Sequence, residues 1–287
     1  MARLDVYEPL YMLDLTTWTG ELLGATSTVI SISDGFKYSD YFGSFKYKNG
    51  DIASGTVTGY NYFEGDVIQY SATGLKLNAK SVQYLIDSGD SYGLMELAFK
   101  GNDIIDASSL GDTSPGDYIT DLYGFNGNDA IYGSDGRDYI DGGNGNDKIY
   151  GNAGDDSILG GLGKDILTGG SGVDDFYFDT KLGSSNVDTI TDFFSGEDAL
   201  SDWDGLNLDV SIFTKLPESI EFGDLTDNLV IGTKALDSND YLIFNPKTYT
   251  LSYDADGSGS GKAVAFVVLT GVTTIIADDI WAYDAAG

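Results

Sequence analysis

The sequence contains no cysteine and no histidine, and only 4 prolines among its 287 residues. Without cysteine the chain cannot form a disulfide framework. Without histidine it cannot carry a Ser-His-Asp or Cys-His catalytic site, and an ordinary zinc enzyme site lacks its main ligand. Oxygen ligands remain, and they suit hard cations, calcium first among them.

Basic residues are also scarce, with 15 Lys and Arg against 46 Asp and Glu, a formal net charge of −31. Nucleic-acid binding needs clusters of Lys and Arg, so we expect no nucleic-acid partner. This charge makes a compact state self-repelling unless cations neutralise it. No apolar run approaches the ~20 residues of a membrane helix, so we expect no membrane span, and the N-terminus does not resemble a cleaved secretory signal.

Glycine, in contrast, is abundant, and its placement is periodic. Steps of nine from Gly124 give six consecutive units: GFNGNDAIY, GSDGRDYID, GGNGNDKIY, GNAGDDSIL, GGLGKDILT and GGSGVDDFY. Positions one and four are always glycine, namely Gly124, Gly127, Gly133, Gly136, Gly142, Gly145, Gly151, Gly154, Gly160, Gly163, Gly169 and Gly172. Position six is always aspartate: Asp129, Asp138, Asp147, Asp156, Asp165 and Asp174. Position eight is always large and apolar.

Each unit is expected to form a turn followed by a very short strand. The paired glycines permit positive φ and close backbone approach, so the turn presents carbonyl groups inward. The aspartate adds an anionic oxygen, and the apolar residue at position eight points inward from the strand. One such strand is not stable alone, but stacked units share a core. The alternative is a glycine-aspartate linker, but a linker would not keep an apolar residue at position eight of every unit.

The nonapeptide resembles the calcium-binding repeat of the RTX family, and the resemblance covers Gly124–Phe178. It implies a right-handed parallel β-roll with two repeats per coil, in which each calcium lies between a turn and the turn two repeats later. The implied sites pair Asp129 with Asp147, Asp138 with Asp156, Asp147 with Asp165, and Asp156 with Asp174, completed by glycine carbonyls. With the degenerate copies described next, this predicts about four to six Ca²⁺ ions.

Two degenerate copies precede the array. The first has Gly101, Asp103 and Ile105 at the proper offsets, and the second has Asp117 and Ile119 without the spaced glycine. Asp103 and Asp117 are therefore candidate calcium ligands in entry coils over residues 99–123. An ordinary strand-turn connection is the alternative.

The predicted fold is all-β, with the roll over 99–178 between an N-terminal antiparallel β domain (1–98) and a C-terminal β-rich cap (179–287). Alternating residues predict the N-terminal strands, with short helices near Pro9–Leu15 and Ser81–Asp87. The tyrosines of these strands either stack on a sugar or partner or, more often in proteins, pack the strand faces. They are Tyr38, Tyr41, Tyr60 and Tyr62.

An aromatic cluster is expected to seal the C-terminal end of the roll. It comprises Phe176, Tyr177, Phe178, Phe193 and Phe194, in a segment that resembles the cap of the serralysin-type C-terminal domain. Further on, Tyr249–Tyr253 and Ala263–Leu269 predict a hairpin around DADGSGSGK. Asp254 and Asp256 begin this loop like an EF-hand, but Ala265 stands where the closing glutamate belongs, which favours a plain turn over a calcium site.

The RTX resemblance implies an extracellular protein, exported by a type I system without a cleaved N-terminal signal. We expect a protein that folds on extracellular calcium and serves as a structural or adhesive component, with self-association or a surface polysaccharide as partner. A secreted carbohydrate-active enzyme or glycan-binding protein is the alternative, with weak candidate carboxylates at Asp14, Glu21, Asp34, Glu64 and Asp66. A membrane-active toxin is disfavoured, and the absence of histidine excludes a serralysin-type protease.

Overall fold

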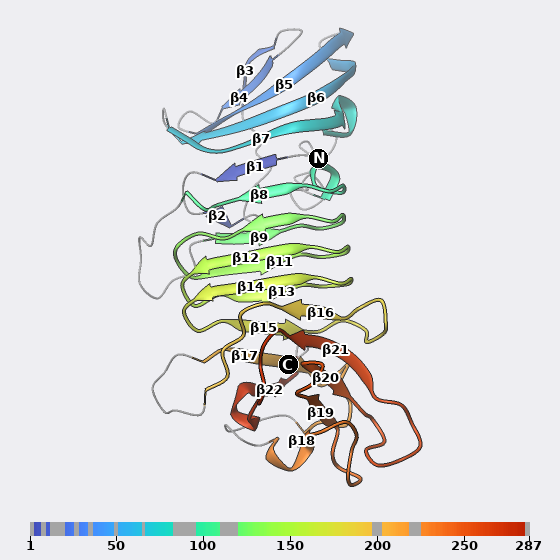
Figure 1. The fold of residues 1–287 in the computed structure, drawn as a ribbon. Coiled ribbons are helices and arrows are strands. Elements are labelled where there is room, and N and C mark those ends of the chain that lie inside the picture. The colour runs from blue at the N-terminus through green and yellow to red at the C-terminus, as the bar shows by residue number, and fades with distance from the viewer. Residues whose placement is uncertain are drawn as a thin grey trace.

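The computed structural model describes residues 3–6, 10–11, 21–25, 29–33, 37–48, 51–64, 67–82, 96–109, 120–196, 203–217 and 225–284. Its strands form two sheets that run along the molecule (Figure 1). The 15-stranded sheet contains, in spatial order, β18 (Leu229–Ile231), β19 (Leu242–Asn245), β20 (Thr250–Tyr253), β21 (Val264–Leu269), β16 (Asp188–Ile190), β14 (Ile166–Ser171), β12 (Lys148–Ala153), β10 (Ala130–Tyr132), β8 (Ile104–Asp106), β1 (Arg3–Val6), β7 (Val67–Asn78), β6 (Asp51–Glu64), β5 (Lys37–Lys48), β4 (Val29–Ser33) and β3 (Glu21–Ala25). The 7-stranded sheet contains β2 (Leu10–Tyr11), β9 (Thr120–Tyr123), β11 (Asp138–Asp141), β13 (Ser157–Leu159), β15 (Asp175–Phe178), β17 (Gly205–Asp209) and β22 (Ile280–Tyr283).

The repeats form a parallel β-roll, as predicted. Successive strands alternate between the two sheets, so that Ile131 pairs with Ile149 in one sheet and Ile140 with Ile158 in the other. The position-eight side chains between the sheets are fully buried or nearly so: Ile131, Ile140, Ile149, Ile158, Leu167 and Phe176. Burying each such side chain contributes roughly 1.5–3 kcal/mol. A coil therefore acquires its core only when its neighbours are in place.

The N-terminal strands β3 to β7 pair antiparallel, as the alternation of the sequence indicates. β1 then joins this sheet to the roll, because it pairs antiparallel with β7 and parallel with β8. β2 pairs parallel with β9 in the second sheet. The prediction of a helix near Pro9–Leu15 is wrong at Leu10–Tyr11, where pairing with β9 fixes a strand. Residues 79–82 are helical and overlap the other predicted helix.

The roll continues beyond the repeats on the C-terminal side. β16 and β17 extend the two sheets, and β21 and β22 add a further parallel strand to each. β20 and β21 form the predicted antiparallel hairpin. Beyond β20, β19 and then β18 complete this end of the 15-stranded sheet (Figure 1).

The predicted aromatic cluster is only partly formed. Phe176 lies beside Phe193 with ring centroids 6.3 Å apart, and Phe178 packs edge-on against Phe266. Phe194, however, is 61% exposed, and the outward-facing Tyr177 pairs with Tyr283. Tyr177 and Phe194 therefore do not belong to the buried seal, because alternate strand residues face opposite ways and Phe194 follows the end of β16.

Tyr41 of the N-terminal module is buried and lies 4.8 Å from Tyr60, centroid to centroid, so this pair packs a strand face. Tyr38 and Tyr62 lie outside the residues whose side chains the structure describes. Among the described residues, no helix combines the length and apolar character needed to cross a bilayer. The division of the chain at residues 98 and 178 stays a prediction.

Candidate calcium-binding turns

Position-four glycines shape the turns of the roll. Five of them have positive φ: Gly127 (150°), Gly145 (145°), Gly154 (111°), Gly163 (152°) and Gly172 (134°). A Cβ at Gly145 would collide with the carbonyl oxygen of Gly127 in the preceding coil. Glycine is therefore required at this position both by the backbone conformation and by the close stacking of coils.

The position-six aspartates form a hydrogen-bonded ladder along one edge of the roll. Within it, the amide of Asp129 donates to Oδ1 of Asp147 at 2.7 Å, and the amide of Asp147 donates to Oδ1 of Asp165 at 2.8 Å. Asp103 begins this row, since its amide donates to Oδ1 of Asp129 at 2.7 Å. The structure thus places the predicted entry-coil residue Asp103 in line with the array.

A second ladder runs along the opposite edge. The amide of Asp138 donates to Oδ1 of Asp156 at 2.9 Å, and the amide of Asp156 donates to Oδ1 of Asp174 at 3.0 Å. In the preceding coil, the position that corresponds to Asp138 is occupied by Thr120, according to the register of β9 and β11. The second degenerate copy was therefore misplaced: Thr120 and Leu122 occupy the aspartate and apolar columns, and Asp117 lies outside the described residues.

Both ladders continue into the cap through two residues that the sequence analysis missed. The amide of Asp165 donates to Asp188 Oδ1 at 3.0 Å, and the amide of Asp174 donates to Asp204 Oδ1 at 3.1 Å. The intervals in sequence are 23 and 30 residues, so a fixed step of nine does not find them. A signal was present, because each aspartate is followed two residues later by an apolar one, Ile190 or Leu206.

The second carboxylate oxygen of the repeat aspartates is oriented differently from the first. Oδ2 of Asp129, Asp147, Asp156 and Asp165 is buried and accepts no hydrogen bond from the residues that the structure describes. A Cβ built on Gly142 would lie 2.8 Å from Asp147 Oδ2 and 2.7 Å from the carbonyl oxygen of Gly160. A carboxylate oxygen and a carbonyl oxygen of the next coil therefore converge beside the glycine at position one. Oxygen-only groups of this kind suit calcium.

Burial makes these carboxylates costly to ionise in the absence of a cation. It raises the pKa of Asp129 and Asp147 to about 7, and that of Asp156 to about 9. The neighbouring aspartates add to the effect, as Asp188 does when it helps to raise the pKa of Asp165 to about 8. Hydrogen bonds from the preceding coil oppose the shift without cancelling it. A bound divalent cation would offset this cost.

The hairpin loop is organised differently. The amide of Asp256 donates to Asp254 Oδ1, at 3.4 Å, and the amide of Gly261 donates to Asp256 Oδ2 at 2.8 Å. The loop closes on its own backbone, in the manner of a plain turn. The five N-terminal carboxylates named as catalytic candidates lie outside the residues whose side chains are described.

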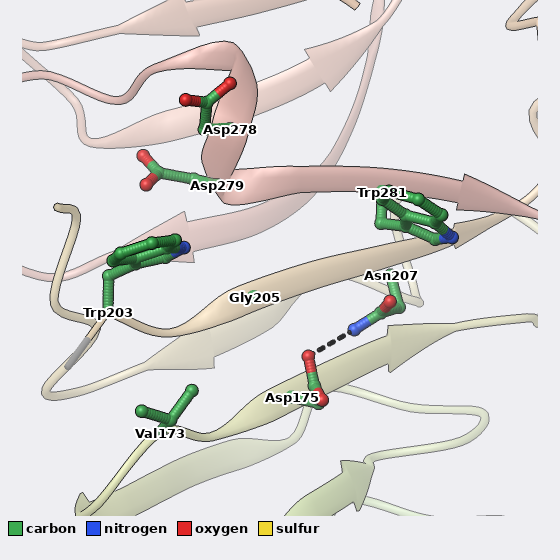
Figure 2. A pocket seen from close by; sticks show the side chains of 8 residues that line it. All are labelled: Val173, Asp175, Trp203, Gly205, Asn207, Asp278, Asp279 and Trp281. Atoms are coloured by element: carbon green, nitrogen blue, oxygen red, sulfur yellow. Dashed lines mark hydrogen bonds between the residues drawn. The ribbon is translucent and has the colours of Figure 1, made fainter. Parts of the chain in front are cut away.

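A cavity of about 400 Å³ lies on the outer face of the second sheet. Trp203 and Trp281 stand on either side of Gly205 (Figure 2). Two other lining residues are joined by a 2.8 Å hydrogen bond, which Asn207 Nδ2 donates to Asp175 Oδ1. Asp279, which also lines the cavity, accepts a 2.6 Å hydrogen bond from Ser195 Oγ.

The geometry defines a parallel β-roll whose turns carry buried carboxylates. Residues 123–158 and 150–179 match the family model described as RTX calcium-binding nonapeptide repeat (4 copies). This part of the chain is therefore an RTX calcium-binding repeat array. No curated protein is significantly similar to the chain.

A solved structure is also similar to this chain. It is the AlgE6R3 subunit from the Azotobacter vinelandii mannuronan C5-epimerase, which matches with 24% identity and a TM-score of 0.34. The match covers 63% of this chain and 86% of that chain.

Proposed function

We propose that the chain is an extracellular protein whose roll folds when calcium binds to its turns. The observation that carries this proposal is that the buried Oδ2 atoms of Asp129, Asp147, Asp156 and Asp165 have no hydrogen-bond donor among the described residues. A buried polar atom without a partner is costly, and a buried charge more so. Calcium would satisfy these oxygens, so its binding free energy would become folding free energy.

The proposed ligands are the position-six carboxylates together with main-chain carbonyls of the turns. Asp188 and Asp204 occupy the same ladder position in the cap, and Asp103 does so at the start. Sites of extracellular modules are typically weak, with dissociation constants on the order of 0.1–1 mM. The roll would therefore stay unfolded where calcium is scarce and fold outside the cell, after export by a type I system.

The test is far-UV circular dichroism during a calcium titration from chelator to millimolar concentrations, with magnesium as the control ion. We expect a transition from coil to β-structure with calcium alone, because magnesium prefers a smaller, more rigid octahedral site. A roll that is fully folded in chelator would refute calcium-dependent folding.

For the role of the folded protein, we propose a structural or adhesive component that assembles end to end. β3 and β18 stand at opposite ends of the 15-stranded sheet, and each pairs with one neighbour among the described strands. Exposed strand edges are templates for further pairing, and contacts between unlike ends extend into filaments. Calcium would reduce the charge of −31 that opposes such contacts.

This role is tested by light scattering and electron microscopy at saturating calcium. Ile231→Lys places a charge on the edge strand β18, at a residue 46% exposed, and should abolish assembly while leaving calcium-dependent folding intact. Leu236→Lys, at a residue 72% exposed and outside the strands, is the matched control. A wild-type protein that stays monomeric in calcium would overturn the assembly role alone.

A second candidate role, binding a glycan, is favoured by the cavity beside Trp203 and Trp281. The two indoles offer apolar faces, and Asp175, Asp278 and Asp279 offer only hydrogen-bond acceptors when ionised. A ligand that fits this lining has an apolar face, hydroxyl or ammonium donors, and no negative charge. We therefore propose a sugar ring without acidic groups.

Isothermal titration calorimetry with neutral, amino and uronic-acid oligosaccharides tests this second role. We expect binding of the first two classes, lost in Trp281→Ala and kept in Phe194→Ala, since Phe194 is exposed and outside the cavity lining. Binding of uronic acids only, or of none of the sugars, would refute it.

A further inference from the structure

We infer that one turn of the array, Gly133–Asp138, holds no calcium ion, because the hydroxyl groups of Thr120 and Ser134 occupy the carboxylate of Asp138 in its place. The inference rests on the proposed function, in which the other turns bind calcium. On this inference the predicted calcium site between Asp138 and Asp156 does not form. The predicted site between Asp156 and Asp174 is unaffected.

The hydrogen bonds at Asp138 differ from those of the other repeat aspartates. Its Oδ1 accepts from the amide of Thr120 at 3.2 Å and from Thr120 Oγ1 at 2.6 Å. Ser134 Oγ lies 3.0 Å from Oδ1 and 2.9 Å from Oδ2. Oδ2 also accepts from the amide of Ser134 at 2.6 Å. Both oxygens are thus supplied with donors, whereas Oδ2 of Asp129, Asp147, Asp156 and Asp165 has no donor within the described part of the chain.

The backbone of this turn is also distinct. In the other five turns the residue at position two has positive φ, namely Phe125 (65°), Gly143 (86°), Asn152 (81°), Gly161 (87°) and Gly170 (115°). Neither Ser134 at position two nor Gly136 at position four has positive φ. This turn therefore adopts a conformation that none of its neighbours shares.

The altered backbone turns donors toward the carboxylate. The Ser134 amide points at Asp138 Oδ2, and the Gly136 amide donates to Ser134 Oγ at 3.1 Å. A cation requires acceptor oxygens around it, and N–H groups in the same space repel it. Ser134 is fully buried, so its hydroxyl group is held beside the carboxylate of Asp138. The turn is internally satisfied without metal.

Its position gives this turn a structural role. Among the described residues, the second ladder begins at Thr120, and Asp138 of the metal-free turn is the next member. The metal-free turn therefore lies at the end of the roll that meets the N-terminal strands. The two adjacent coils to which β9 and β11 belong are thereby held together before calcium binds. They would serve as a preformed end on which the calcium-dependent coils stack.

The experiment is to count bound calcium ions by native mass spectrometry and by equilibrium dialysis, using the full chain. Ser134→Gly removes the hydroxyl and supplies the glycine that three other turns have at position two. We expect this variant to bind one more ion than the wild type. Asn152→Gly, at position two of the next turn on the same edge, is the control and should bind the same number as the wild type.

Two aspartate variants provide an independent measurement. Asp138→Asn should leave the number of bound ions unchanged, whereas Asp156→Asn, in the same ladder, should lose at least one. An unchanged count in Ser134→Gly, or a lost ion in Asp138→Asn, would overturn the inference. A wild-type chain that binds no calcium would instead refute the proposed function, so the two failures are distinguishable.

Discussion

The main-chain amide of Asp147 donates a 2.8 Å hydrogen bond to Oδ1 of Asp165, the corresponding aspartate one coil further along the same edge. Oδ2 of Asp165 is buried, and no described residue donates a hydrogen bond to it. The two oxygens of one carboxylate therefore have separate tasks. Oδ1 fixes the spacing of the coils, and Oδ2 is left for a cation. This division allows the structural and metal-binding contributions to be measured separately.

Asp165→Asn should impair calcium binding while preserving the stacking of coils. The amide oxygen can still accept from the Asp147 amide, but an NH₂ group replaces Oδ2 and a negative charge is lost. A charge-assisted contact is worth roughly 1.5–3 kcal/mol, so we expect the calcium midpoint to rise by about 10-fold or more. Circular dichroism during calcium titration measures the midpoint.

Asp155→Asn is the control for that variant. Asp155 is exposed, half of its side-chain surface being accessible, and its Oδ1 accepts from the Val173 amide, a bond that asparagine can keep. Its midpoint should change by less than about 2-fold, because exposed charges contribute little. Equal shifts in both variants would mean that overall charge, rather than Oδ2 of the ladder aspartate, governs binding.

Calcium-free protein should become less stable as pH rises. Burial raises the pKa of Asp129 and Asp147 to about 7 and that of Asp156 to about 9, from the ordinary aspartate value of 3.8. The folded state then binds more protons than the unfolded state, so the free energy of unfolding falls as pH rises from about 4 through about 9. Each such group contributes a slope of up to about 1.4 kcal/mol per pH unit.

Far-UV circular dichroism in chelator at pH 5 and pH 8 measures this dependence, and we expect more β-structure at pH 5, although less than in calcium. Saturating calcium should reverse the sign, because the cation competes with protons for the same carboxylates. A content of β-structure in chelator that is constant or rises between these pH values would show that protonation of the ladder carboxylates does not favour folding.

Most of the roll was predictable because its physical constraints recur at a fixed step. Gly145 and Asp147 each meet the same requirement one coil away, at Gly163 and Asp165, and repetition makes the requirement visible. Asp188 was not predictable in the same way, because longer connections separate it from its ladder neighbour. Only the pairing of strands in the structure shows that Asp188 occupies the position of a repeat aspartate.

Two other features needed the structure for different reasons. β1 pairs with β8, and these strands are separated by the whole N-terminal sheet in sequence, so no local pattern links them. Ser134 stands at a repeat position that tolerates several residue types, and its effect depends on a hydroxyl hydrogen bond that composition does not reveal. Side-chain chemistry at a variable position is therefore where the repeat pattern is least informative.

Gly145→Ala should prevent normal stacking of the roll. Its φ of 145° is rarely adopted by residues with a Cβ, and the added methyl group would collide with the Gly127 carbonyl. Backbone strain of this kind costs about 1–3 kcal/mol before the collision is counted. Gly183→Ala is the control, since a methyl group added there would meet nothing within 4 Å. Urea unfolding in calcium should show the loss in the first variant alone.

The shared core of the coils predicts a large effect of Ile149→Ala. Ile149 has no exposed surface and lies between Ile131 and Leu167 of the adjacent coils, so truncation leaves a cavity that the stacked backbone cannot close. Such a change typically costs about 2–5 kcal/mol, and we expect a loss of that size in the free energy of unfolding in calcium. Ile166→Ala, on the outer face at 40% exposure, should cost less than about 1 kcal/mol. If the two variants were equally stable in urea unfolding, the position-eight column would not be the core that holds the coils together.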